Sequence, residues 1–170
     1  SLDLSEENAT WRECEVTLSR PCAYGVSVSL PDGSGLWMGG SHPDGHLDQV
    51  VHLEWIDGSL RLTSLEPLPF PLAYAAGAVV GDVIYLQGGQ IDPSGHASDE
   101  LLSLGVSDLD SSWIRHDPIP GGKGRILATA GSHGGSLYVF GGCRLRKLDS
   151  NEQGASDHRR EYLQEAWRYD

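Results

Sequence analysis

Short apolar runs that end in a pair of glycines recur about fifty residues apart along the chain. The runs are LWM, VIYLQ and SLYVF, and they precede or adjoin the pairs Gly39-Gly40, Gly88-Gly89 and Gly141-Gly142. Their apolar positions are nearly continuous rather than strictly alternating. We therefore expect strands that are buried on both faces.

A hairpin is predicted in front of each glycine pair. Its first strands read AYGVSVSL, AYAAGAVV and ILATAGSH, over residues 23–30, 73–80 and 126–133. The dipeptides Gly81-Asp82 and Gly134-Gly135 suit two-residue hairpin loops, and a longer PDGSG turn closes the first hairpin.

Further strands are predicted after each glycine pair. Third strands cover residues 48–55, 99–106 and 165–170, and two units add a fourth segment that ends in prolines, over 60–69 and 112–120. A repeated unit of four antiparallel strands is the blade of a β-propeller. The sequence therefore predicts an all-β propeller, in which the paired glycines allow the backbone to turn sharply against a neighbouring blade.

The predicted blades occupy residues 21–66, 71–117 and 123–170 of a single propeller segment over 1–170. Residues 10–17, TWRECEVT, resemble an outer strand, because Trp11 stands where Trp113 stands in its own unit, and the last blade lacks its outer strand. Three blades do not close a ring. Either the chain is half of a six-bladed propeller, or a second copy completes the ring and residues 10–17 complete the partner's last blade.

Composition and charge narrow the classes of partner. A formal net charge of −12 disfavours nucleic acid and anionic membranes. Cys14, Cys22 and Cys143 are an odd number without a C-x-x-C motif, so we expect buried or free thiols rather than a zinc site. No apolar run is long enough to span a membrane, and the first ten residues do not read as a signal peptide. The compartment stays open.

The repeated unit resembles the kelch repeat in its glycine pair, its later aromatic residue and its outer-strand Trp. The stretches PCAYGVSVSLPDG, LPFPLAYAAGAVVGDVIYLQGG and PIPGGKGRILATAGSHGGSLYVFGG resemble the kelch-type sialic acid mutarotases, in their cyclically permuted branch. This resemblance implies a six-bladed propeller that interconverts the anomers of N-acetylneuraminate without a metal or nucleotide cofactor. The carboxylate and arginine proposed for catalysis in that family lie in a loop of a later blade, so neither is placed on a residue of this sequence.

A sugar acid requires a cation for its carboxylate, and a propeller usually holds its ligand at one mouth of the central channel. Arg125 and Arg20 precede inner strands and are candidates for binding the carboxylate; the alternative is a surface ion pair with a neighbouring acid. Tyr24 and Tyr74 occupy matched positions on inner strands and are candidates for contacting the sugar, or for packing around the channel.

Mutarotation also requires an acid at the ring oxygen and a base at the anomeric hydroxyl. Titratable residues in or beside the loops between second and third strands are candidates, with a solvated loop as the alternative for each; they are His42, His46, Asp48, His96, Asp99, Glu100 and Glu161. Asp48 and Asp99 recur at equivalent places, which favours a structural role. We expect no metal site, because the spacing from His42 to His46 lies in a turn and no third ligand is evident. The charged insertion over residues 143–164 is either a lid or a solvated loop.

The leading interpretation is a carbohydrate mutarotase or epimerase that acts on a sialic-acid-like sugar by general acid–base catalysis, without a cofactor. The alternative is a kelch module that binds a partner protein through its loops and has no catalytic activity. The expected partners are a small sugar and, in one of the two assemblies, a second copy of the chain. The segment taken alone is a candidate for an inactive part of the enzyme, since its resemblance covers half a ring.

Overall fold

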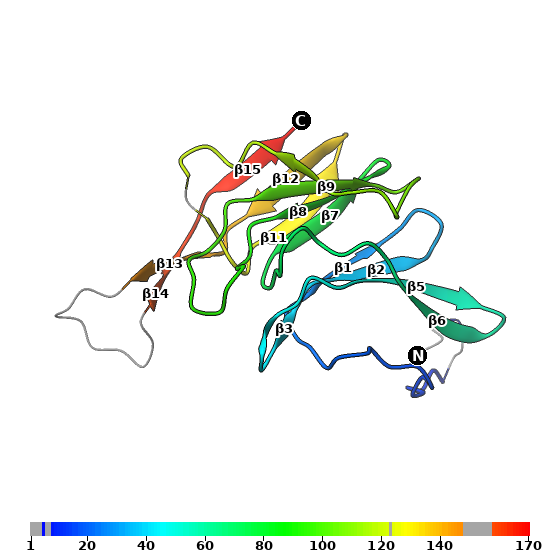
Figure 1. Cartoon of the computed structure of the whole chain (residues 1–170). Coiled ribbons are helices and arrows are strands. Elements are labelled where there is room, and N and C mark those ends of the chain that lie inside the picture. The colour runs from blue at the N-terminus through cyan, green and yellow to red at the C-terminus, as the bar shows by residue number, and fades with distance from the viewer. Residues whose placement is uncertain (1–4, 6–7, 123, 148–157) are drawn as a thin grey trace.

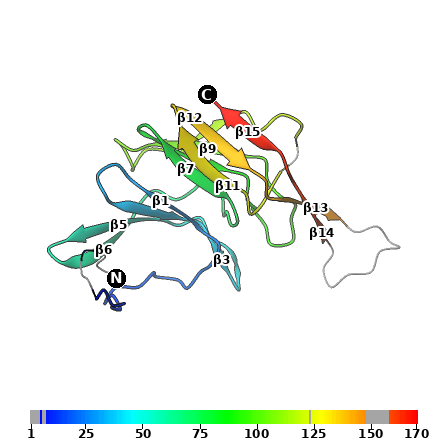
Figure 2. The ribbon, with the colours of Figure 1, turned by 180° about the vertical axis from the view of Figure 1, so that it is seen from behind.

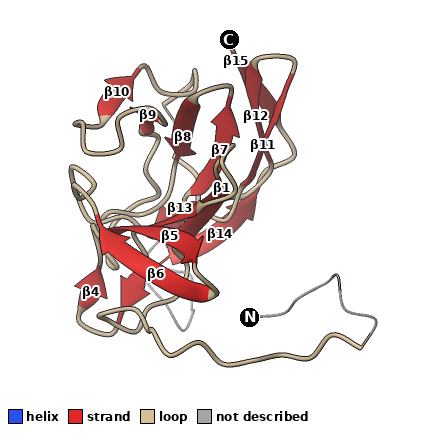
Figure 3. Cartoon of the chain, turned by 90° about the vertical axis from the view of Figure 1, so that its right-hand side faces the viewer, coloured by secondary structure: helices blue, strands red, loops and turns tan. Residues whose placement is uncertain are grey.

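The computed structural model describes residue 5 and residues 8–122, 124–147 and 158–170. The described residues form β-strands, turns and loops but no helix (Figure 3), so no helix of membrane-spanning length occurs among them. The strands pair antiparallel, and the three largest sheets lie side by side as blades of a β-propeller (Figures 1 and 2). The predicted all-β fold is confirmed.

The first sheet has the order β1-β2-β5-β6. Its strands are β1 (Val26–Ser29), β2 (Gly35–Met38), β5 (Val50–Ile56) and β6 (Ser59–Ser64). The second sheet has the order β10-β9-β8-β7, built from β7 (Ala76–Val80), β8 (Val83–Gln87), β9 (Leu101–Gly105) and β10 (Ile114–His116). Each therefore follows the predicted sequence of inner hairpin, third strand and outer strand.

The third sheet contains three described strands, in the order β11-β12-β15. They are β11 (Thr129–His133), β12 (Ser136–Phe140) and β15 (Ala166–Tyr169). Two further hairpins extend the loops after β2 and β12: β3 (Ser41–His42) with β4 (Gly45–His46), and β13 (Cys143–Lys147) with β14 (His158–Tyr162). The second of these hairpins is the base of the charged insertion, whose residues 148–157 lie outside the described residues.

Apolar side chains between neighbouring sheets form the core. Between the first and second sheets the buried cluster includes Leu36, Met38, Ile84, Leu86 and Leu104. Between the second and third sheets a smaller cluster consists of Ala78, Leu101, Leu137 and Val139. Because a blade in the middle buries both faces, β8 and β9 are almost wholly buried, as their continuous apolar sequences predict.

The paired glycines are required where adjacent sheets meet. Gly39 and Gly88 have positive φ, and a Cβ at either would overlap a carbonyl oxygen of the segment leading into the next sheet, that of Leu72 or Arg125. The following glycines donate to the same two carbonyls, from Gly40 N to Leu72 O and from Gly89 N to Arg125 O, both at 2.8 Å. The glycine pairs therefore hold consecutive sheets in close backbone contact.

Residues 10–17, predicted to be an outer strand, form no strand within the chain by itself, and Trp11 is 83% exposed. Residues 12–16 lie beside Trp55 and the turn between β5 and β6, along the path of the N-terminal segment in Figure 1. The third strand of the first sheet already pairs with β6, so it offers these residues no free edge. Their predicted partner is the last blade of a closed ring, and that pairing stays a prediction.

Candidate functional site

Three non-glycine residues with left-handed backbone mark one end of the sheets. Tyr24, Tyr74 and Leu127 have φ of 60°, 61° and 57°, and each leads into the inner strand of its sheet. The N–H of Tyr74 donates to the carbonyl of Tyr24 at 2.9 Å, and the N–H of Leu127 donates to the carbonyl of Tyr74 at 3.0 Å. Such a conformation is strained for residues with a side chain and persists because the hydrogen bonds fix it. We call this end of the sheets the crossover end.

The two predicted tyrosines lie together at the crossover end. Their ring centroids are 4.6 Å apart with the planes tilted by 32°, and Tyr24 is 58% exposed whereas Tyr74 is half-buried. An aromatic pair with one exposed ring offers an apolar face with polar hydroxyl groups, which suits the mixed surface of a sugar. The structure thus brings these two predicted residues into direct contact.

His46 lies beside this pair, on β4. Its ring contacts Tyr74 edge-on, with centroids 5.8 Å apart, and its Nε2 lies 3.4 Å from Oε1 of Gln90. Gln90 Nε2 donates to the carbonyl of Gly95 at 2.8 Å, so the amide oxygen faces His46 and the histidine proton resides on Nε2. Nδ1 is then an acceptor; it is buried and has no partner among the described residues.

The protonation state of His46 follows from its surroundings. Burial lowers the pKa of His46, and the hydrogen bond to Gln90 and the charge of Asp92 oppose that shift only in part. The imidazole is therefore neutral near pH 7, with a lone pair on Nδ1. A neutral imidazole with a fixed tautomer is able to accept a proton or a hydrogen bond from a hydroxyl group.

Arg125 is located differently from its predicted place at the channel mouth. Arg125 is only 1% exposed. Its Nη1 donates to the carbonyl of Gly141 at 3.0 Å, and this hydrogen bond ties the segment between the second and third sheets to the loop after β12. Burial lowers the pKa of Arg125; Glu165 opposes this shift and Arg144 adds to it. In this conformation Arg125 acts between sheets, and its role in binding a carboxylate stays a prediction.

Arg144 and Glu165 form a second polar cluster next to Arg125. Arg144 Nη2 lies 3.4 Å from Glu165 Oε1, and both side chains are partly buried. Arg144 Nε, Arg125 Nε and Glu165 Oε2 are buried without a hydrogen-bond partner among the described residues. Arg144 was visible in the sequence only as one charge of a long insertion, and its position depends on the pairing of β13 with β14.

Arg20 lies on the rim of the crossover end. Its Nη2 is 3.1 Å from His42 Nδ1 and 3.7 Å from Asp44 Oδ2, and His42 Nδ1 also lies 3.2 Å from that carboxylate oxygen. All three groups belong to or adjoin the β3–β4 hairpin. This contact matches the alternative that the sequence left open, an arginine paired with a neighbouring acid.

The remaining predicted acids and bases are dispersed. Glu100 pairs with Arg115 at 3.6 Å. Glu161 is exposed on β14, where its Cα partner is Arg144. Asp48 and His96 are exposed and Asp99 is half-buried. No group of three or more metal-binding side chains occurs among the described residues.

A second histidine cluster was missed by sequence reasoning. His116 Nε2 lies 2.7 Å from Ser103 Oγ, and His116 Nδ1 lies 3.1 Å from the hydroxyl of Tyr169 on the third sheet. The ring of Tyr85 packs against both His116 and Tyr169, and burial raises the pKa of Tyr85. No sequence spacing signals this cluster, because Tyr169 reaches His116 only when the second and third sheets pack.

Comparison with known proteins gives partial matches. No family model matches the chain. A kelch repeat-containing protein of Arabidopsis thaliana is 37% identical over 94 residues, which are 54% of this chain and 21% of that protein. N-acetylneuraminate epimerases of two Haemophilus influenzae strains are each 30% identical over 102 residues, 60% of this chain and 23% of each epimerase. The chain is thus similar to kelch-repeat proteins, and the matches cover less than a quarter of their length.

Proposed function

We propose that the chain is part of a kelch-type epimerase that accelerates anomer interconversion of N-acetylneuraminate or a similar sugar acid. The similarity to the two N-acetylneuraminate epimerases carries the proposal. The crossover end supports it, because an exposed aromatic pair and a neutral histidine lie together there. The activity, the substrate and the blade count of the complete protein all belong to this proposal.

The proposed chemistry opens and recloses the hemiacetal of the sugar. A base takes the proton of the anomeric hydroxyl while an acid protonates the ring oxygen, and the reverse transfers close the other anomer. His46 is assigned as the base on the strength of the lone pair on its Nδ1, which has no partner among the described residues. The sugar ring would pack against Tyr24 and Tyr74. No residue of the chain is assigned as the acid.

Exchange spectroscopy by NMR tests this function. The chain is added to N-acetylneuraminate, and magnetisation transfer between the two anomers is measured. Acceleration that His46→Gln reduces by about tenfold or more would support the proposal, because general bases commonly contribute factors of that size or larger. His133→Gln, at an exposed histidine that ends β11, is the matched control and should leave the rate unchanged. An assembly that contains the folded chain in a closed ring and gives no acceleration would contradict the proposal.

A second candidate function is binding of a partner protein without catalysis. The chain is also similar to a kelch repeat-containing protein of Arabidopsis thaliana, at 37% identity, whose name states no enzymatic activity. The same NMR measurement separates the two candidates. Unaltered anomer exchange, together with saturable binding of a protein that Tyr24→Ala abolishes, would favour the binding module.

A further inference from the structure

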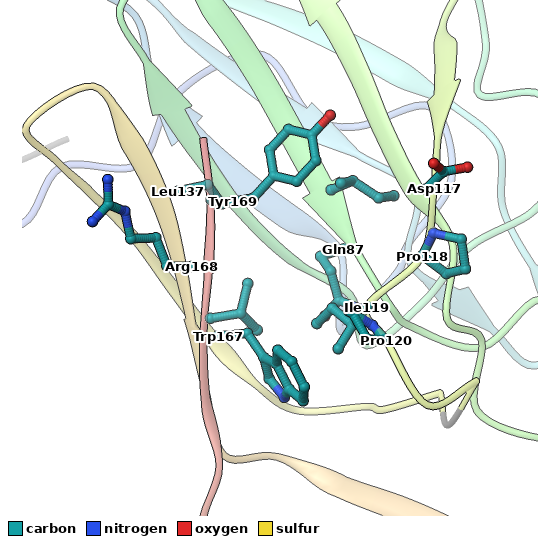
Figure 4. A pocket seen from close by; sticks show the side chains of 11 residues that line it. Gln87, Asp117, Pro118, Ile119, Pro120, Leu137, Trp167, Arg168 and Tyr169 are labelled. Atoms are coloured by element: carbon teal, nitrogen blue, oxygen red, sulfur yellow. The ribbon is translucent and has the colours of Figure 1, made fainter.

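A cavity lies between the second and third sheets, beneath the crossover that joins them (Figure 4). Its volume is about 60 Å³. Leu101, Leu137 and Val139 form its apolar wall, and Pro118 to Pro120 cover it. Gln87 lines the same cavity and directly precedes the glycine pair of β8, so the cavity is at the crossover end of the sheets.

Gln87 is the unexplained group in this cavity. The residue is 2% exposed, and neither its Nε2 nor its Oε1 has a hydrogen-bond partner among the described residues. A buried amide that satisfies none of its donors and acceptors is costly, and buried amides in proteins are normally paired. Its two polar atoms therefore call for a partner that is not part of the described chain.

The repeat shows that packing alone does not require a glutamine here. Met38 occupies the same place in the first sheet, directly before its glycine pair, and it is fully buried against the second sheet. The register also makes Trp167 on β15 the equivalent of Leu102 on β9. At the first interface methionine and leucine fill the space, whereas at the second interface glutamine and tryptophan line a cavity.

Trp167 adds a second unpartnered polar atom. The residue lines the cavity, and its indole Nε1 is buried without an acceptor among the described residues. An indole N–H is a donor only, whereas a primary amide offers both a donor and an acceptor. The cavity thus combines donors, one acceptor and an apolar wall in a space that suits a small, uncharged group.

We propose that this cavity binds an acetamido group. The carbonyl oxygen of the group would accept from Trp167 Nε1 or from the amide of Gln87, its N–H would donate to Gln87 Oε1, and its methyl would pack on Leu137 and Val139. A carboxylate lacks the N–H and brings a charge. Arg168 and Asp117 also line the cavity, but the guanidinium of Arg168 is paired with Asp170 at 2.6 Å, and the carboxyl group of Asp117 would repel a second carboxylate. The assignment of this acetamido group to an N-acetylated sugar rests on the proposed function. Binding of an acetamido group by itself does not depend on that function.

Titration with acetamide tests the site directly. The indole N–H resonance of Trp167, assigned with Trp167→Phe, is followed by ¹H–¹⁵N NMR in the whole chain while acetamide is added. A saturable shift is expected, with a dissociation constant in the millimolar range or weaker because the ligand is so small. Acetate and 2-propanol should shift the resonance at least tenfold less at equal concentration.

Gln87→Met is the decisive variant, because it copies the residue that the chain itself uses at position 38. It should weaken acetamide binding by tenfold or more while leaving the chain folded. Gln49→Met, outside the cavity, should not change the titration. A shift that does not saturate, equal shifts with all three additives, or unchanged binding in Gln87→Met would overturn the proposal and leave a cavity that holds water.

A second measurement separates this site from the proposed function. Anomer exchange is compared for N-acetylneuraminate and for the analogue that carries a hydroxyl in place of the acetamido group. A tenfold or larger preference for the acetylated sugar that Gln87→Met removes supports the sugar assignment. Acetamide binding without anomer exchange for either sugar leaves the site standing and contradicts the proposed function. Equal exchange for both sugars contradicts the sugar assignment.

Discussion

The hydroxyl of Ser103 lies 2.7 Å from Nε2 of His116, within the second sheet. Nδ1 of the same ring lies 3.1 Å from the hydroxyl of Tyr169 on the third sheet. Ser103 is 4% exposed and both contacts are partly buried, so this is a largely buried polar connection between the two sheets. Because each hydroxyl is able to donate or accept, both contacts are satisfied with either neutral tautomer of the histidine. The connection fixes how the third sheet sits on the second.

Tyr169→Phe and Ser103→Ala should each lower the free energy of unfolding by about 1 kcal/mol, since each removes one hydrogen bond of the connection. The double variant should deviate from additivity by at least about 0.5 kcal/mol, because both bonds share the ring of His116. Urea denaturation of the four proteins measures the cycle. Strict additivity would mean that the two bonds act independently.

Gly88→Ala should be far more damaging than Gly81→Ala. Both glycines have positive φ, but a Cβ at Gly88 overlaps the Arg125 carbonyl, whereas a Cβ at Gly81 meets nothing within 4 Å. We expect a loss of about 1 kcal/mol for Gly81→Ala from backbone strain alone. Gly88→Ala should cost at least about 3 kcal/mol. Similar unfolding midpoints for the two variants would contradict this prediction, because they would show that the overlap with the Arg125 carbonyl is relieved with little loss of stability.

Arg125→Ala should lower the free energy of unfolding by about 2–5 kcal/mol, because it empties a buried volume and removes the donor to Gly141. Arg125→Met should cost less, since it keeps most of the volume and removes the desolvated charge. Arg61→Ala, exposed on β6, should change stability by no more than about 0.5 kcal/mol. Denaturation curves check the order; a neutral Arg125→Ala would contradict the buried role.

The free energy of unfolding should decrease as the pH is lowered, because His46 takes up a proton more readily in the unfolded chain. Burial holds the pKa of His46 below its ordinary value of about 6.5. The unfolded chain then binds a proton that the folded chain excludes, so stability is complete above about pH 6.5 and decreases as the pH falls below it. His46→Gln should reduce the difference between urea midpoints at about pH 7.5 and about pH 5.5. His133→Gln should leave that difference unchanged.

The strands were predictable because their signals are local. The turn at Gly81-Asp82 and the alternation of apolar runs with glycine pairs place β7, β8 and β9 within the ranges read from the sequence. The outer strand predicted at residues 10–17 stays a prediction, for a reason that is not local. Whether a segment forms an edge strand depends on a free partner edge, and no pattern within the segment reports that.

The candidate site was predictable only in part. Tyr24 and Tyr74 were found because they repeat at matched positions, and their contact follows from the stacking of successive sheets. Gln90, Arg144 and Trp167 were missed, since each is a single polar or aromatic residue among many. Gln87 was visible as the one polar residue in an apolar run, but its burial and its unpartnered amide depend on the third sheet.

By itself the sequence determined the class of fold, the order of strands within each unit and the places where the backbone must be glycine, because hydrophobic periodicity and φ preferences act over a few residues. Tertiary structure decided which side chains meet: that Arg125 is enclosed, that His46 keeps a free lone pair, and that Gln87 and Trp167 line one cavity. These depend on how one sheet packs on the next, and the free energy of that packing comes from residues far apart in the chain.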